Sequence, residues 1–124
     1  MRAIVLFVAI LGALSAGHSR AQDAPAGEKV FAKCKTCHTV RDDKNKVGPS
    51  LKGVIGRAAG THPGFKYSTA MIEAGKGGLV WDDPRLTEYL HNPKAVVKGT
   101  KMAFPGLKSD DDVKAVIAYL KQFP

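Results

Sequence analysis

Only two of the 124 residues are cysteines, Cys34 and Cys37, and both belong to one short motif. A framework of several disulfide bridges and a four-cysteine zinc site are therefore excluded. A mixed cysteine–histidine zinc site is disfavoured too, because no H-x-x-x-H pair follows and His62 and His91 stand alone. A disulfide between such close cysteines would close a small loop and add little stability. A thioredoxin-like redox pair needs a βαβ context, which the sequence lacks.

The chain also lacks long hydrophobic runs, clustered basic residues and strand patterns of useful length. Its longest apolar run, residues 3–14, is too short for a comfortable membrane span. Basic residues are scattered among acidic ones, which argues against nucleic-acid binding. No internal repeat or linker divides the chain, so we expect one domain. Without a strand pattern, that domain is predicted to be all-α.

The first residues have the features of a secretory signal peptide. Arg2 precedes the apolar run, and Ser19 and Ala21 place small residues at positions −3 and −1 of a cleavage site. We predict that residues 1–21 are a cleaved leader and that residues 22–124 form a single exported domain without stable membrane insertion. For a bacterium, export means the periplasm. The mature chain has 17 basic and 11 acidic residues, a net charge of +6, which favours docking to an acidic surface.

The most informative feature that is present is C-K-T-C-H at residues 34–38. This C-x-x-C-H motif is the attachment site of a c-type haem. Two thiols three residues apart on a helical turn can each form a thioether with one vinyl group of a single haem, and His38 can turn its imidazole to the iron. Attachment requires reduced thiols outside the cytoplasm, which agrees with the predicted export. We therefore predict one haem c, covalently bound through Cys34 and Cys37.

Helix signals alternate with long loops. We expect a helix that begins near Pro25, a short helix over residues 69–73 capped by Ser68, a helix from residues 82–84 to near Asn92, and a last helix after Ser109. Residues 39–67 are rich in Gly, Pro and Lys and are predicted to be loop. A loop of that length in a small domain needs something to fill its centre, and the haem would do so.

The second axial ligand of the iron decides the function. A free sixth site binds gases or peroxide, whereas a filled one restricts the iron to electron transfer. The candidates are Met71, Met102, His62, His91 and several lysines. Met102 lies in a Gly- and Pro-rich loop between two predicted helices, which favours it, whereas Met71 falls in a predicted helix where apolar packing is expected. His62 and His91 are expected at the surface.

The residues between Gly27 and Lys121 resemble, in order, the class I cytochromes c of the mitochondrial and bacterial cytochrome c2 type. The matching features are Gly27, Phe31, C-K-T-C-H, Gly48-Pro49, Gly56-Arg57, Gly60, Pro63-Gly64-Phe65, Tyr67, Trp81, Tyr89-Leu90, Asn92-Pro93-Lys94, G-T-K-M-x-F and I-A-Y-L-K. The resemblance implies an all-α fold wrapped around one haem. It also implies that Gly27 lets the first and last helices cross closely near Tyr119.

For the iron, the resemblance implies His38 and Met102 as its axial ligands. Pro49 would accept a hydrogen bond from the His38 imidazole and fix its orientation. Tyr89 would lie near the Met102 sulfur and tune the iron.

For the haem periphery, the resemblance implies that Arg57, Tyr67 and Trp81 hydrogen-bond a buried propionate, which needs partners. Thr100 would bond the other propionate or the loop backbone, and Phe104 would cover the exposed haem edge.

These expectations predict a monomeric one-electron carrier rather than an enzyme. The resemblance implies a cytochrome bc1-type donor and, as acceptor, a terminal oxidase or a photosynthetic reaction centre. A ring of lysines would steer docking onto acidic surfaces of these complexes: Lys33, Lys35, Lys46, Lys94, Lys98, Lys101 and Lys108. The alternatives are a peroxidase or gas binder with an open iron site, a dedicated donor to one periplasmic enzyme, and a purely structural haem protein.

Overall fold

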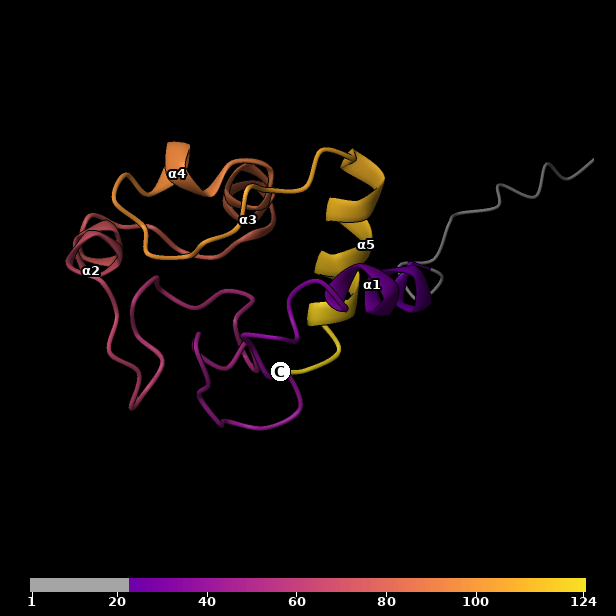
Figure 1. Cartoon of the computed structure of the whole chain (residues 1–124), viewed down its shortest axis with the longest axis horizontal. Coiled ribbons are helices and arrows are strands. Elements are labelled where there is room, and N and C mark those ends of the chain that lie inside the picture. Colours follow the sequence, from indigo (N-terminus) through magenta and orange to yellow (C-terminus); the bar gives the residue numbers. More distant parts are fainter. Residues whose placement is uncertain (1–22) are drawn as a thin grey trace, which may run out of the picture.

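Helices α1 (Ala24–Phe31) and α5 (Asp110–Leu120) cross each other at one side of the domain (Figure 1). The structure, a computed structural model, describes residues 23–124, so the predicted leader at residues 1–21 lies outside the described residues. The crossing depends on Gly27. A Cβ atom at this position would lie 2.0 Å from the Ala115 carbonyl oxygen and 2.7 Å from Cβ of Tyr119. The predicted close approach of the first and last helices is therefore confirmed.

The ends of the helices follow the capping chemistry of the sequence. Asp82 and Ser109 accept hydrogen bonds from backbone N–H groups in the first turns of α3 (Asp83–His91) and α5. Helix α3 ends where Pro93 follows, as predicted. Three aspartates stand in the first turn of α5, where the helix dipole favours negative charge.

Two features of the helical part differ from the prediction. Helix α2 (Thr69–Lys76) extends three residues beyond the predicted end at Glu73, because Gly75 is small enough for the helix to pass the backbone of Ala59. A short helix, α4 (Pro93–Val96), was not predicted. It follows α3 directly, and Asn92 both ends α3 and caps α4 through its side chain.

Residues 39–67 form no helix, as predicted, and lie beside α1 and below α3 in the view of Figure 1. Strand pairing among residues 23–124 is limited to one isolated bridge between Ala58 and Val80. The domain is therefore all-α, in agreement with the prediction.

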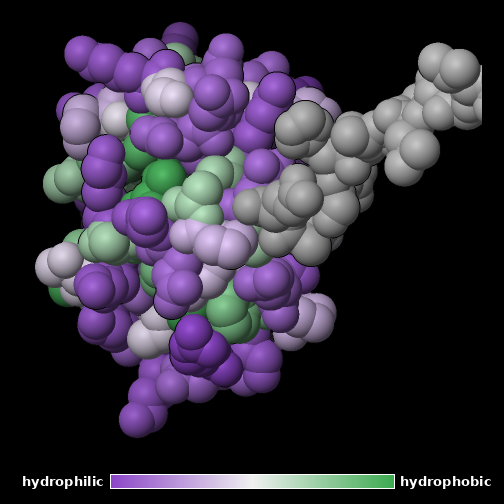
Figure 2. All heavy atoms as spheres, turned by 90° about the vertical axis from the view of Figure 1, so that its right-hand side faces the viewer, coloured by the Kyte–Doolittle hydropathy of each residue, from purple (hydrophilic) through white to green (hydrophobic). Residues whose placement is uncertain are grey.

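The hydrophobic core lies between α1, α3 and α5. Val113 and Val116 of α5 are fully buried, and Phe31 of α1 packs on Tyr119 with ring centroids 5.3 Å apart. The outer face of the α1–α5 side is mostly hydrophilic, with hydrophobic side chains only in small patches (Figure 2). Within residues 23–124, no helix has both the length and the apolar character needed to cross a membrane.

Candidate haem site

The C-x-x-C-H motif lies on turns that continue directly from the end of α1. The N–H groups of Cys37 and His38 both donate to the carbonyl oxygen of Cys34, at 3.0 and 2.9 Å. This winding brings the two cysteines and His38 onto one short segment. Both thiols are half-buried and neither is in a disulfide. Burial raises the pKa of the Cys34 thiol, although the neighbouring Lys33 opposes this effect.

His38 is held in one orientation by its Nδ1 atom, which lies 2.7 Å from the carbonyl oxygen of Pro49. A carbonyl can only accept, so Nδ1 carries the hydrogen. Burial lowers the pKa of His38, with a smaller opposing effect of the bond to Pro49, so the neutral ring is favoured. The neutral ring then has its lone pair on Nε2, the atom that could bind a metal ion.

Gly48 is a residue whose role sequence reasoning missed. A Cβ atom at Gly48 would lie 2.4 Å from Cε1 of His38, so a side chain here would displace the ring. Its N–H donates to the Cys37 carbonyl oxygen at 2.8 Å, which ties this loop back to the motif. The only signal in the sequence was its position directly before Pro49.

Met102 lies in the segment between α4 and α5, residues 97–109, which we call the Met102 loop. The hydroxyl of Tyr89, on α3, donates to the Met102 sulfur at 3.8 Å. Burial raises the pKa of Tyr89, and a hydrogen bond with Thr100 partly opposes this, so the phenol keeps its proton. Thr100 also accepts from the Met102 N–H at 3.3 Å. The structure thus brings Tyr89, Thr100 and Met102 together.

The structure links the three residues predicted to bind one propionate. Arg57 and Tyr67 both contact His62, and the Trp81 backbone N–H donates to the Arg57 carbonyl oxygen at 2.9 Å. Arg57 donates to the carbonyl oxygens of Lys52 and Ser50 at 2.9 and 3.1 Å, and to Nδ1 of His62 at 3.0 Å. The Tyr67 hydroxyl accepts from the His62 N–H at 3.0 Å. Burial lowers the pKa of Arg57, with Tyr67 opposing this.

Trp81 is buried against Tyr89, with ring centroids 4.6 Å apart. Its backbone N–H and carbonyl oxygen are hydrogen-bonded to Arg57 and Gly56, which holds the Trp81 ring beside this loop.

The expectation that His62 and His91 are surface residues is wrong for His62 and only partly right for His91. His62 is 6% exposed, and both of its ring nitrogens have partners. Nδ1 faces Arg57, and Nε2 lies 3.3 Å from the carbonyl oxygen of Asp43. His91 is 30% exposed and has partners for both ring nitrogens. No sequence pattern predicted these contacts, and those with Asp43 and Leu107 join distant parts of the chain.

The remaining predicted residues lie at or near the surface. Phe104 is half-buried and lines, with its neighbours, an open hollow of about 500 Å³ between α4 and the Met102 loop. All seven lysines predicted for docking are exposed: Lys33, Lys35, Lys46, Lys94, Lys98, Lys101 and Lys108.

The donor set fits a covalently held haem better than a bare metal ion. Within residues 23–124, no group of three or more His, Cys, Asp or Glu side chains is arranged to hold a metal. The chain instead offers two unpaired thiols on one turn, an imidazole oriented through Nδ1 and a thioether. Two thioether bonds and two axial ligands require just such groups.

An all-α domain with this motif after its first helix and a methionine loop before its last helix defines the class I c-type cytochrome fold. The sequence profile of the family named "Cytochrome c" matches residues 24–124. The chain belongs to the cytochrome c family, and it is accordingly a haem-dependent electron carrier.

Similar proteins include cytochrome c2 iso-2 of Magnetospirillum molischianum, which is 61% identical over 99 residues, covering 80% of this chain and 96% of that protein. Cytochrome c2 of Blastochloris viridis is 44% identical over 124 residues, covering 99% of this chain and 94% of that protein. Among solved structures, cytochrome c2 from Rhodospirillum centenum has a TM-score of 0.78 and 46% identity, covering 82% of this chain and 98% of that one.

Proposed function

We propose that this protein is a periplasmic, monomeric one-electron carrier with a single haem c, attached through Cys34 and Cys37 and ligated by His38 and Met102. Electrons would come from a cytochrome bc1-type complex and go to a terminal oxidase or a photosynthetic reaction centre. The observation that carries the proposal is the orientation of His38, whose Nδ1 is occupied by Pro49 while Nε2 is left for a metal. The similarity to cytochromes c2 and the predicted leader support the cellular role.

The haem, when bound, supplies a one-electron couple between ferrous and ferric iron. The neutral imidazole of His38 and the thioether of Met102 both suit ferrous iron, which raises the reduction potential. The hydrogen bond from Tyr89 to the Met102 sulfur withdraws electron density from that sulfur and acts in the same direction. Because His38 and Met102 would remain in place in both redox states, little rearrangement is needed on electron transfer.

The residues around this centre have supporting roles in the proposal. Pro49 holds the imidazole, and Gly48 leaves room for it. Arg57, Tyr67, Trp81 and Thr100 would hydrogen-bond the propionates, and Phe104 would cover the exposed edge. In this proposal the protein carries electrons on its haem and does not catalyse a reaction of its own.

The optical spectrum of the purified mature protein, ferric and ferrous, with and without carbon monoxide, tests the proposal. A weak far-red band in the ferric form and no response to carbon monoxide are expected if Met102 closes the iron. Ready binding of carbon monoxide by the native protein, without the far-red band, would instead favour a peroxidase or a gas binder.

Charge reversal of one docking lysine should slow reaction with an acidic redox partner. Lys101→Glu is expected to lower the bimolecular rate constant roughly three- to tenfold at low ionic strength, because it removes attraction near the Met102 loop. The difference should shrink as salt is added. Lys114→Glu, an equal charge change on the exposed side of α5, is the matched control. Equal slowing by both variants in stopped-flow mixing would show that net charge matters rather than the ring.

A further inference from the structure

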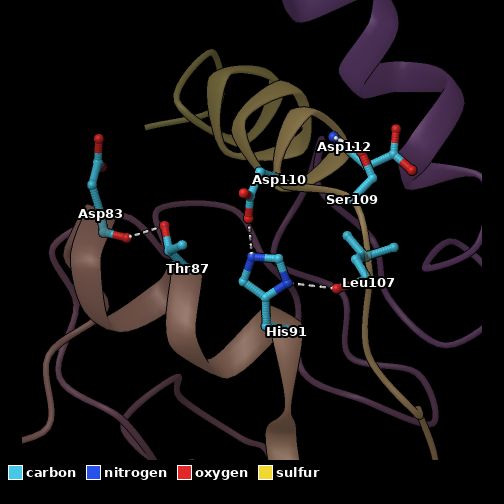
Figure 3. A network of polar contacts seen from close by, with 7 residues as sticks. All are labelled: Asp83, Thr87, His91, Leu107, Ser109, Asp110 and Asp112. Atoms are coloured by element: carbon cyan, nitrogen blue, oxygen red, sulfur yellow. Dashed lines mark hydrogen bonds and ion pairs between the residues drawn. The ribbon is translucent and has the colours of Figure 1, made fainter.

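His91, the last residue of α3, joins three parts of the domain through its ring (Figure 3). Its Nδ1 atom lies 2.7 Å from the carbonyl oxygen of Leu107, near the end of the Met102 loop. Its Nε2 atom lies 2.8 Å from Oδ1 of Asp110, the first residue of α5. The ring thus lies between the loop and the start of the next helix.

Each contact of His91 requires a hydrogen on a different ring nitrogen. The Leu107 carbonyl can only accept a hydrogen, so Nδ1 must be protonated for this bond. Asp110 is 84% exposed at the start of α5, and a carboxylate can likewise only accept. Both contacts are satisfied together only when His91 is an imidazolium. The neutral ring can keep one of them.

Leu107 is bound to the end of α3 by two hydrogen bonds, one through its carbonyl oxygen and one through its N–H. The Leu107 N–H donates to the Leu90 carbonyl oxygen at 2.7 Å, so both peptide groups of Leu107 are bound by the end of α3. Gly106 allows this approach, because a Cβ atom there would lie 2.1 Å from the His91 carbonyl oxygen. We call the bonds of Leu107 to Leu90 and His91, together with the pair between His91 and Asp110, the His91 clasp.

Helix α3 therefore holds the Met102 loop at two points. Tyr89 contacts the Met102 sulfur, and the His91 clasp fixes the loop five residues further along at Leu107. For the sulfur to leave an iron atom, the loop has to move relative to α3. Such movement is opposed by the contacts at Leu107 as well as by the contact at Met102 itself.

We propose that His91 is a positioning residue for Met102: the His91 clasp fixes the end of the Met102 loop, and loss of the clasp makes departure of the Met102 sulfur from ferric iron easier. The inference rests on the proposed ligation by Met102. The ferric form is the sensitive one, because a soft thioether binds ferric iron less well than ferrous iron.

Within the described part of the chain, only Asp110 is within ion-pair distance of the His91 ring. Asp111, the next residue of α5, makes no such contact and therefore provides a matched control for the charge of this helix end.

The test uses the ferric holoprotein and added imidazole, whose binding requires departure of Met102. Loss of the far-red band measures the rate of this binding. His91→Leu should increase the rate of ligand entry roughly two- to tenfold at a fixed pH and imidazole concentration. His91→Gln keeps an amide that can donate to the Leu107 carbonyl oxygen, so its rate of ligand entry should be intermediate. Asp110→Asn should accelerate entry, whereas Asp111→Asn, the same charge change without a contact to His91, should match the wild type.

Hydrogen exchange of the Leu107 amide provides a readout that does not depend on the iron. Faster exchange in His91→Leu, together with faster imidazole entry, supports the proposal. Unchanged exchange, unchanged entry, or equal effects of Asp110→Asn and Asp111→Asn overturn it. If His91→Leu does not fold, His91→Gln and Asp110→Asn answer the same question. A far-red band that persists in Met102→Ala would instead refute the proposed ligation, while Leu107 exchange would still report on the clasp.

Discussion

Met102→Ala should abolish the far-red band of the ferric protein and open the ferrous protein to carbon monoxide. Alanine has no atom that can ligate iron, so the sixth position would pass to water or stay empty. Loss of a ligand that favours ferrous iron should lower the reduction potential by on the order of a few hundred mV, within the roughly 0.8 V that axial ligands control. Optical spectra with carbon monoxide and a redox titration measure both effects.

Met71→Leu is the matched control, because Met71 is a second methionine of the described chain with a different environment. It lies on α2, partly buried against the core, where its side chain serves apolar packing. A leucine of similar volume should cost less than about 1.5 kcal/mol of stability and leave the far-red band in place. If Met71→Leu removed the band and Met102→Ala kept it, the assignment of the two methionines would be reversed.

Much of the fold could be predicted from short-range signals in the sequence. Pro84, Asp82 and Ser109 mark helix starts because proline geometry and side-chain capping act within one turn. The end of α3 before Pro93 has an equally local cause. By contrast, the extension of α2 past Glu73 depends on Gly75 fitting against Ala59, a contact between distant segments. Local propensity contains no information about such a contact.

The candidate site shows the same division. The C-x-x-C-H spacing identified three of its residues, because the chemistry of attachment requires that spacing. The sequence around His62 or His91 does not indicate these contacts, since Asp43 lies 19 residues from His62 and Leu107 lies 16 residues from His91. Histidine has two ring nitrogens with different roles, so its environment is decided by which acceptors the fold places beside each of them.

Gly27→Ala should be among the most destabilising single substitutions in this domain. The added Cβ atom would meet backbone of Ala115 and Cβ of Tyr119, neither of which can turn away as the end of a long side chain can. Helices α1 and α5 would have to separate, which would loosen the packing of Phe31 on Tyr119.

We expect a loss of about 3 kcal/mol of unfolding free energy, at the upper end for overpacked sites, even after the roughly 1 kcal/mol that alanine gains over glycine in a helix. For a domain of this size, that corresponds to a fall in Tm of very roughly 15 °C. Denaturant and thermal unfolding of the holoprotein measure the effect.

Ala26→Gly, at the adjacent exposed position of α1, separates crowding from helix propensity. It should cost only about 1 kcal/mol, because it removes a favourable helix residue without touching α5. A Gly27→Ala variant as stable as the wild type would contradict the prediction, because it would show that α1 and α5 can separate at no cost.

The turn that carries Cys34 continues directly from α1, so a shift of this helix should also move the haem attachment segment. We therefore expect the far-red band of the ferric protein to change in Gly27→Ala and to stay unchanged in Ala26→Gly.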